Sequence, residues 1–185
     1  METLLSRAEY RPSDNCDERP AGIQVDLLVI HSISLPPGQF GGPWIDDLFM
    51  NRLDPAAHPY FLEIKGLRVS THLLIRRDGQ LLQYVPLDRR AWHAGRSSFC
   101  GQDCCNDFSI GIELEGSDNT PFTDAQYATL ADATREIQRH YPAITPERIT
   151  SHGAIAPDRK SDPGPQFDWS RYLASLSNAR TYDQT

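Results

Sequence analysis

The segment 107–116 alternates strictly between apolar and polar residues, and this pattern constrains the fold more than any other feature of the chain. Successive side chains of an extended strand point to opposite faces, so the alternation predicts a strand with one apolar, buried face. The apolar face consists of Phe108, Ile110, Ile112 and Leu114, and the opposite face of Ser109, Gly111, Glu113 and Glu115.

Four other segments rich in β-branched and apolar residues predict further strands. The dipeptide Asp78-Gly79 predicts a hairpin, because aspartate and glycine tolerate the backbone angles of a two-residue turn. In a regular strand before this turn, His72 lies on the same face as Ser70, Leu74 and Arg76. The expected strands are 25–34, the two hairpin strands 69–76 and 80–86, and 148–152.

Helix signals flank these strands. Thr123 and Gln126 form a capping box, and Pro142 ends the helix that begins there. Asp168 is expected to cap the last helix, and Pro43 to occupy the first position of a short helix over 44–52. Strands that alternate with helices predict an α/β fold.

No repeat or interdomain linker divides the chain, so we expect a single domain over residues 25–177. Residues 1–24 are expected to form a leader packed on this domain, and residues 178–185 a polar tail. The segment 53–67 has no regular pattern and is expected to be irregular.

Acidic residues outnumber basic ones, 25 to 18, and give the chain a formal net charge of −7. Nucleic acids and anionic membranes bind clustered positive charge, so this composition argues against both as partners. No apolar run is long enough to span a bilayer, and the N-terminus lacks the apolar core of a signal peptide. The adjacent Cys104 and Cys105 suit a reducing compartment. The sequence therefore predicts a cytoplasmic protein.

Two histidines and an aspartate have the composition of a catalytic metal site. His31 and His152 lie at the ends of predicted strands, where side chains meet over the edge of a sheet, and Asp162 follows ten residues after His152. Two imidazoles and one carboxylate leave a fourth position for water, as in catalytic zinc sites. The alternative is a core histidine at His31, a loop residue at His152 and a turn residue at Asp162.

Glu113 and Lys160 are candidates for the chemistry itself. Glu113 lies beside Gly111, whose missing side chain is expected to leave room for a ligand. A carboxylate there is placed to take a proton from an activated water, a step typically worth about 10²- to 10⁴-fold in rate. Lys160, two residues before Asp162, is expected to stabilise negative charge on a carbonyl oxygen. The alternative is that these side chains, like Glu115 especially, are simply solvated.

Five segments of the chain are specific enough to indicate a protein family, and the match covers roughly residues 27–169. In order, they resemble the cytoplasmic AmpD-type 1,6-anhydro-N-acetylmuramoyl-L-alanine amidases, relatives of the zinc N-acetylmuramoyl-L-alanine amidases and of the peptidoglycan recognition proteins. The resemblance implies a mixed central β-sheet flanked by helices, with a zinc site in a groove on one face. The segments are HSISLPPGQFGGPWID, LRVSTHLLIRRDG, RAWHAG, CNDFSIGIELEG and SHGAIAPDRKSDPG.

The resemblance also implies roles for individual residues. The reaction is hydrolysis of the amide between the lactyl group of 1,6-anhydro-N-acetylmuramic acid and L-alanine, during recycling of wall fragments. The expected protein is therefore a zinc-dependent hydrolase that acts on an anhydro-muropeptide. It is expected to be a monomer. By matching positions, the zinc ligands are His31, His152 and Asp162, the catalytic residues are Glu113 and Lys160, and the muropeptide contacts are Arg68, His72, Trp92 and Arg159.

Three positions depart from the usual pattern of this family. Ser32 stands in place of an asparagine, Cys104 in place of a frequent arginine, and Ala154 in place of a carboxylate. None is among the five residues assigned to chemistry, so the departures bear on substrate affinity and on the preference for the anhydro sugar. Two other functions stay open: a module that binds muropeptides without cleaving them, and a lytic amidase that acts on intact peptidoglycan.

Overall fold

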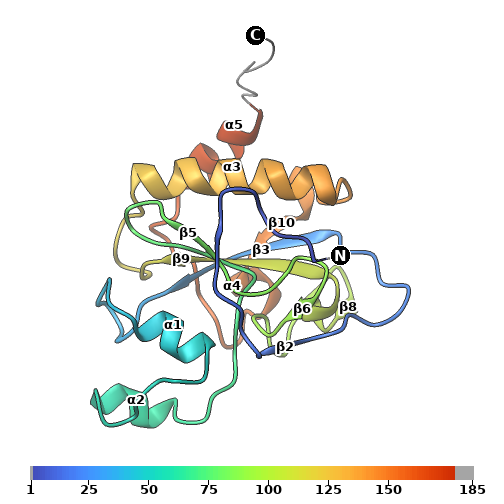
Figure 1. Cartoon of the computed structure of the whole chain (residues 1–185). Coiled ribbons are helices and arrows are strands. Elements are labelled where there is room, and N and C mark those ends of the chain that lie inside the picture. Colours follow the sequence, from blue (N-terminus) through green and yellow to red (C-terminus); the bar gives the residue numbers. More distant parts are fainter. Residues whose placement is uncertain (1, 178–185) are drawn as a thin grey trace.

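A six-stranded mixed sheet forms the centre of the protein in the computed structural model, which describes residues 2–177 (Figure 1). Strands β4, β9, β3 and β10 run parallel to one another, with β10 at the edge, and β5 returns antiparallel beside β4 through the expected hairpin. The predicted α/β fold with a mixed central sheet is confirmed. The strands in spatial order are β1 (Glu9–Tyr10), β5 (Leu81–Gln83), β4 (Leu73–Ile75), β9 (Ser109–Glu115), β3 (Leu27–Ile33) and β10 (Ile149–Ser151).

Helices α3 (Asp124–His140) and α5 (Trp169–Ser177) cover one face of the sheet (Figure 1). The predicted capping box is present, since Thr123 Oγ1 accepts from Gln126 N and Gln126 Oε1 accepts from Thr123 N, each at 3.1 Å. Asp168 Oδ1 accepts from Arg171 N at 2.9 Å and so caps α5 as expected. The apolar face of β9 packs here, and the core between sheet and helices includes Leu73, Ile75, Ile110, Ile112, Leu114, Leu130, Ile137 and Tyr172.

Two short helices, α1 (Trp44–Phe49) and α2 (Pro59–Glu63), lie on the other side of the sheet (Figure 1). The expectation of an irregular segment over 53–67 is wrong, because α2 forms within it. His58 Nδ1 accepts from Tyr60 N at 3.2 Å and caps a helix that is too short to show a periodic pattern. Pro43 is the N-cap of α1 rather than its first helical residue.

The leader is tied to the sheet through β1, which pairs parallel with β5. Leu5 is buried in the core under α3, and Ser6 N donates to Glu136 Oε1 on α3 at 2.7 Å. The tail expected at 178–185 lies outside the described residues. No helix within residues 2–177 has the length and apolar character needed to cross a membrane.

The other elements of the fold are short. Two small antiparallel pairs join β2 to β6 and β7 to β8. The remaining elements are single turns of helix. The bounds are β2 (Cys16–Asp17), β6 (Arg90–Ala91), β7 (Ser98–Phe99), β8 (Gln102–Asp103), η1 (Cys105–Asp107), η2 (Pro146–Arg148) and α4 (His152–Ile155).

Candidate active site

Three adjacent parallel strands bring His31, Glu113 and His152 together. His31 on β3 pairs in register with Glu113 on β9, and His152 follows directly after β10. Because residues paired in a parallel sheet point to the same face, His31 and Glu113 both lie on the face opposite α3. The rings of His31 and His152 have centroids 4.4 Å apart, and Glu113 Oε1 lies 4.0 Å from His31 Nδ1.

Asp162 joins the two histidines to form a group of three metal-donor residues. Its Oδ2 lies 3.4 Å from His31 Nδ1 and 3.1 Å from His152 Nδ1. The ligand atoms of the three residues lie within 4.8 Å of one another. The backbone holds this arrangement, because the carbonyl of Asp162 accepts from the Gly153 N–H beside His152 at 2.9 Å. The three residues proposed as ligands from the sequence are thus adjacent in space.

The donor set fits a zinc ion. His152 Nε2 lies 3.3 Å from the carbonyl of Ala94, which can only accept, so Nε2 carries the proton and Nδ1 offers its lone pair. Within residues 2–177, the buried His31 Nδ1 has no hydrogen-bond partner, although buried polar atoms are normally satisfied. Two imidazole nitrogens and one carboxylate oxygen are a typical set for catalytic zinc.

Burial also sets the protonation states of the site. It lowers the pKa of His31 to about 4, against the opposing influence of Asp162. Burial acts to raise the pKa of Asp162, but the close approach of the His152 and His31 rings outweighs burial and holds this pKa well below its usual range. A neutral imidazole and an ionised carboxylate are the forms that bind metal. Burial raises the pKa of Glu113 well above its ordinary value; Asp162 adds to the rise and Lys160 opposes it.

The metal-donor group opens into a groove of about 570 Å³. Arg159 and Lys160, from the loop before Asp162, bring positive charge to it. The guanidinium of Arg159 is held in place by the carbonyls of Ala94 and Arg96, to which it donates. The groove also has a largely apolar wall, which includes Leu35, Phe49, Tyr60, Ile64 and Leu67.

Arg68 and Trp92 lie beside this groove. The guanidinium carbon of Arg68 is 5.8 Å from the centre of the Trp92 ring. Arg68 lines a neighbouring cavity of about 360 Å³, which shares the side chains of Leu48, Ile64 and Leu67 with the groove. Arg68 therefore lies beyond the part of the apolar wall that the two cavities share.

The structure does not bring His72 to the groove. His72 is fully buried, its Nδ1 accepts from Gly111 N at 3.0 Å, and its Nε2 lies 3.0 Å from the carbonyl of Arg89. The expectation that Gly111 leaves room for a ligand is also wrong. The ring of His93 fills that space, since a Cβ at position 111 would lie 2.6 Å from it.

His93 is the site residue that the sequence did not single out. Its Nδ1 lies 2.9 Å from His31 Nε2, and its side chain lines the groove. Asn106 Oδ1 accepts from the backbone N–H groups of His93 and Ala94, at 3.1 and 2.7 Å, and so fixes the loop that carries them. The available signal was Gly111, because a glycine in an alternating strand marks the close approach of another group.

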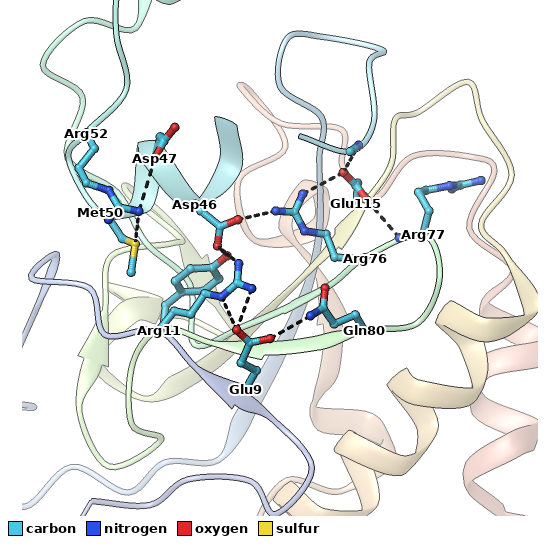
Figure 2. A network of polar contacts seen from close by, with 12 residues as sticks. Glu9, Arg11, Asp46, Asp47, Met50, Arg52, Arg76, Arg77, Gln80 and Glu115 are labelled. Atoms are coloured by element: carbon cyan, nitrogen blue, oxygen red, sulfur yellow. Dashed lines mark hydrogen bonds and ion pairs between the residues drawn. The ribbon is translucent and has the colours of Figure 1, made fainter. Parts of the chain in front are cut away.

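Glu115 belongs to a second buried cluster, at the end of β9 beyond the groove (Figure 2). Its carboxylate accepts from the Arg76 guanidinium at 3.1 Å, from Arg77 N at 3.1 Å and from Gly41 N at 2.6 Å. On the other side of the guanidinium, Arg76 donates to Asp46 Oδ2 at 2.5 Å. Glu115 is only 2% exposed, so its interpretation as a solvated residue is wrong. The cluster fixes the loop that supplies Ser34, Leu35 and Pro37 to the groove.

Comparison with known proteins agrees with this geometry. The N-acetylmuramoyl-L-alanine amidase family, Amidase_2, matches residues 21–165. The 1,6-anhydro-N-acetylmuramyl-L-alanine amidase AmpD of Escherichia coli K12 is 58% identical over 177 residues, which cover 96% of each chain.

Two solved structures are also similar. The crystal structure of a selenomethionine AmpD derivative has a TM-score of 0.92 at 57% identity, covering 95% of this chain and 98% of that one. A complex of the E. coli amidase AmiD with anhydro-N-acetylmuramic acid-L-Ala-D-γ-Glu-L-Lys has a TM-score of 0.60 at 31% identity, covering 87% of this chain and 61% of that one. The chain belongs to the N-acetylmuramoyl-L-alanine amidase family.

Proposed function

We propose that this protein is a zinc-dependent amidase that cleaves the bond between the lactyl group of 1,6-anhydro-N-acetylmuramic acid and L-alanine in muropeptides, in peptidoglycan recycling. The observation that carries the proposal is the group of His31, His152 and Asp162, of which His152 and Asp162 line one groove with Glu113. Similarity to AmpD over nearly the whole chain supports it, as does the anhydro-muropeptide in the AmiD complex.

His31, His152 and Asp162 would hold the zinc ion. When bound, zinc supplies a Lewis acid that polarises the lactyl carbonyl and makes water more acidic. The three side chains come from β3, α4 and the loop after α4, so binding of the metal also joins these elements. Their nearly complete burial keeps solvent from competing for the donor atoms.

Glu113 is the proposed proton acceptor and donor. Its Oε2 is buried and has no hydrogen-bond partner within residues 2–177, so it is free to take a proton from the attacking water. The raised pKa of Glu113 favours holding that proton until the amine of L-alanine departs and receives it. One carboxylate can therefore serve both halves of the hydrolysis.

Lys160 and Arg159 are the proposed cations for the substrate. Lys160 lines the groove close enough to oppose the rise in the pKa of Glu113, and its ammonium would stabilise the negative oxygen of the tetrahedral intermediate. Arg159 would attract a carboxylate of the peptide. Arg68 and Trp92 would contact the ligand beyond the apolar wall. Buried His72 has a different proposed role, which is to support β9 through Gly111.

We place the enzyme in the cytoplasm and expect it to act as a monomer. Its four cysteines are free thiols, and two of them, Cys104 and Cys105, are adjacent in sequence. Free thiols persist in a reducing compartment. Soluble anhydro-muropeptides, rather than the intact wall, would be the substrate available there.

Mass spectrometry of two substrates tests the proposal. The protein is incubated in parallel with an anhydro-muropeptide and with intact sacculi, and Glu113→Gln serves as the inactive control. We expect release of free peptide from the soluble fragment only. Cleavage of sacculi at a comparable rate would indicate a lytic amidase, and binding of the fragment without cleavage would indicate a binding module; either result overturns the proposal.

A further inference from the structure

We propose that His93 and Ser109 form a buried relay that fixes which ring nitrogen of His31 carries the proton, and thereby keeps His31 Nδ1 ready to bind metal. The proposal rests on the proposed zinc site and assigns a positioning role to two residues outside it. The relay has three consecutive contacts: Cys105 O to Ser109 Oγ at 2.5 Å, Ser109 Oγ to His93 Nε2 at 3.1 Å, and His93 Nδ1 to His31 Nε2 at 2.9 Å.

The direction of the relay follows from its fixed end. The carbonyl of Cys105 can only accept, and two oxygen atoms 2.5 Å apart need a hydrogen between them, so the Ser109 hydroxyl donates to it. Ser109 Oγ has no second hydrogen and must accept from His93 Nε2–H. A neutral imidazole has one donor and one acceptor, so His93 Nδ1 accepts from His31 Nε2–H. This leaves the lone pair of His31 on Nδ1, the nitrogen that faces Asp162.

His31 needs such a relay, whereas His152 does not. His152 Nε2 meets the Ala94 carbonyl directly, and a carbonyl fixes the tautomer by itself. The partner of His31 is another imidazole, which either donates or accepts depending on its own tautomer. Without Ser109, the two tautomers of the His93–His31 pair would satisfy the shared hydrogen bond equally, and one of them places an N–H where the metal binds.

The relay is shielded and rigid. His31 and Ser109 are fully buried, and His93 is 8% exposed. Gly111 gives the His93 ring its space against β9, and Asn106 holds the backbone of His93. Water therefore has little access to replace a lost partner, and hydrogen bonds to the outer nitrogen of a ligating histidine typically change metal affinity by about 10- to 100-fold.

Nitrogen NMR of the metal-free protein tests the tautomers directly. With ¹⁵N-labelled histidine, long-range ¹H–¹⁵N spectra distinguish protonated from unprotonated ring nitrogens. We expect both His31 and His93 to carry the proton on Nε2 in the wild type, and Ser109→Ala to populate His31 protonated at Nδ1. His31 protonated at Nδ1 in the wild type, or no change in Ser109→Ala, overturns the proposal.

Zinc affinity, measured by competition with a chelator, tests the consequence. We expect His93→Leu and Ser109→Ala to weaken zinc binding by about 10-fold or more. His93→Asn, whose amide oxygen can still accept from His31 Nε2–H, should recover most of the loss. Thr134→Val removes another buried hydroxyl, bonded to Tyr172 on the far side of the sheet, and should bind zinc as the wild type does.

The outcomes separate the relay from the proposed function. Wild-type affinity in folded His93→Leu and Ser109→Ala, checked by circular dichroism, overturns the relay alone. Equal losses in His93→Leu and His93→Asn would also overturn it, because a purely structural role would not distinguish them. Failure of the wild type to bind zinc would instead refute the proposed metal site.

Discussion

Lys160 and Lys65 are the only lysines in the chain, and they occupy different cavities. Lys160 lines the groove with Glu113 and Asp162, whereas Lys65 lines the neighbouring cavity with Arg68. If the ammonium of Lys160 stabilises the oxyanion, Lys160→Ala should lower kcat by about 10²-fold or more. Lys65→Ala removes the same charge from the neighbouring cavity, away from the reacting groups, and should leave kcat within about twofold of the wild type. Steady-state kinetics on an anhydro-muropeptide measures both, and similar kcat values for the two variants would remove Lys160 from the chemistry.

His72 makes a separate prediction about stability. Burial, with Arg19 adding to it, lowers the pKa of His72 to about 3, while an unfolded histidine titrates near about 6.5. Between these values the unfolded chain binds a proton that the folded chain does not. The contribution of neutral His72 to the free energy of unfolding is therefore complete above about pH 6.5 and is lost as the pH falls toward 3.

The measurement is urea unfolding at several pH values for the wild type and His72→Gln. Between roughly pH 6 and pH 4, the free energy of unfolding of the wild type should fall more steeply, by about 1.4 kcal/mol per pH unit. Parallel slopes would show that His72 is protonated in the folded protein.

At the level of elements, strand β9 connects the groove to the loop that contains Gly41. Glu113 faces the metal-donor group, and two residues later Glu115 holds Gly41 and Arg76 in the cluster of Figure 2. Removing one partner of a buried ion pair leaves the other charge uncompensated, which typically costs 3–5 kcal/mol, so Glu115→Ala should lower the free energy of unfolding by about 3 kcal/mol or more.

Glu9 provides the matched control within the same cluster, because its side chain is 52% exposed and pairs with Arg11. Exposed pairs contribute about 1 kcal/mol or less, so Glu9→Ala should change the free energy of unfolding by no more than that. Denaturant unfolding of both variants gives the comparison. Losses of equal size would mean that the burial of Glu115 is not what stabilises the loop.

The elements that the sequence predicted are those with a local signal. Strand β9 shows alternation, α3 has its capping box, and the β4–β5 hairpin has its turn. Helix α2 was missed because five residues are too few for a helical period. Strand β1 was missed because two exposed residues become a strand only by pairing with β5, a contact that depends on the tertiary fold.

At the level of the whole molecule, the site is produced by strand order. Strands β10, β3 and β9 are neighbours in the sheet although they are far apart in the sequence, and this arrangement brings together His152, His31 and Glu113. The resemblance to the amidase family anticipated these three residues, because each lies within one of the matching segments. His93 was not anticipated: its loop has no periodic pattern, and its partners Ser109 and His31 come from two different strands.

Charge at this scale is also uneven. The chain has a net charge of −7, yet Arg159 and Lys160 place two cations in the groove. Arg68 lies in the adjoining cavity rather than in the same groove, so these three cations are divided between two cavities. This division suits a ligand whose negative groups are separated along an extended peptide.

The combined zinc content and kcat of Glu113→Gln test the central claim most directly. Glutamine keeps the shape of the side chain but cannot take up the proton, while His31, His152 and Asp162 are unchanged. We expect the variant to bind one zinc per chain as the wild type does and to lose about 10²- to 10⁴-fold in kcat on an anhydro-muropeptide. Full zinc content with a kcat within about twofold of the wild type would contradict the role of Glu113 in proton transfer.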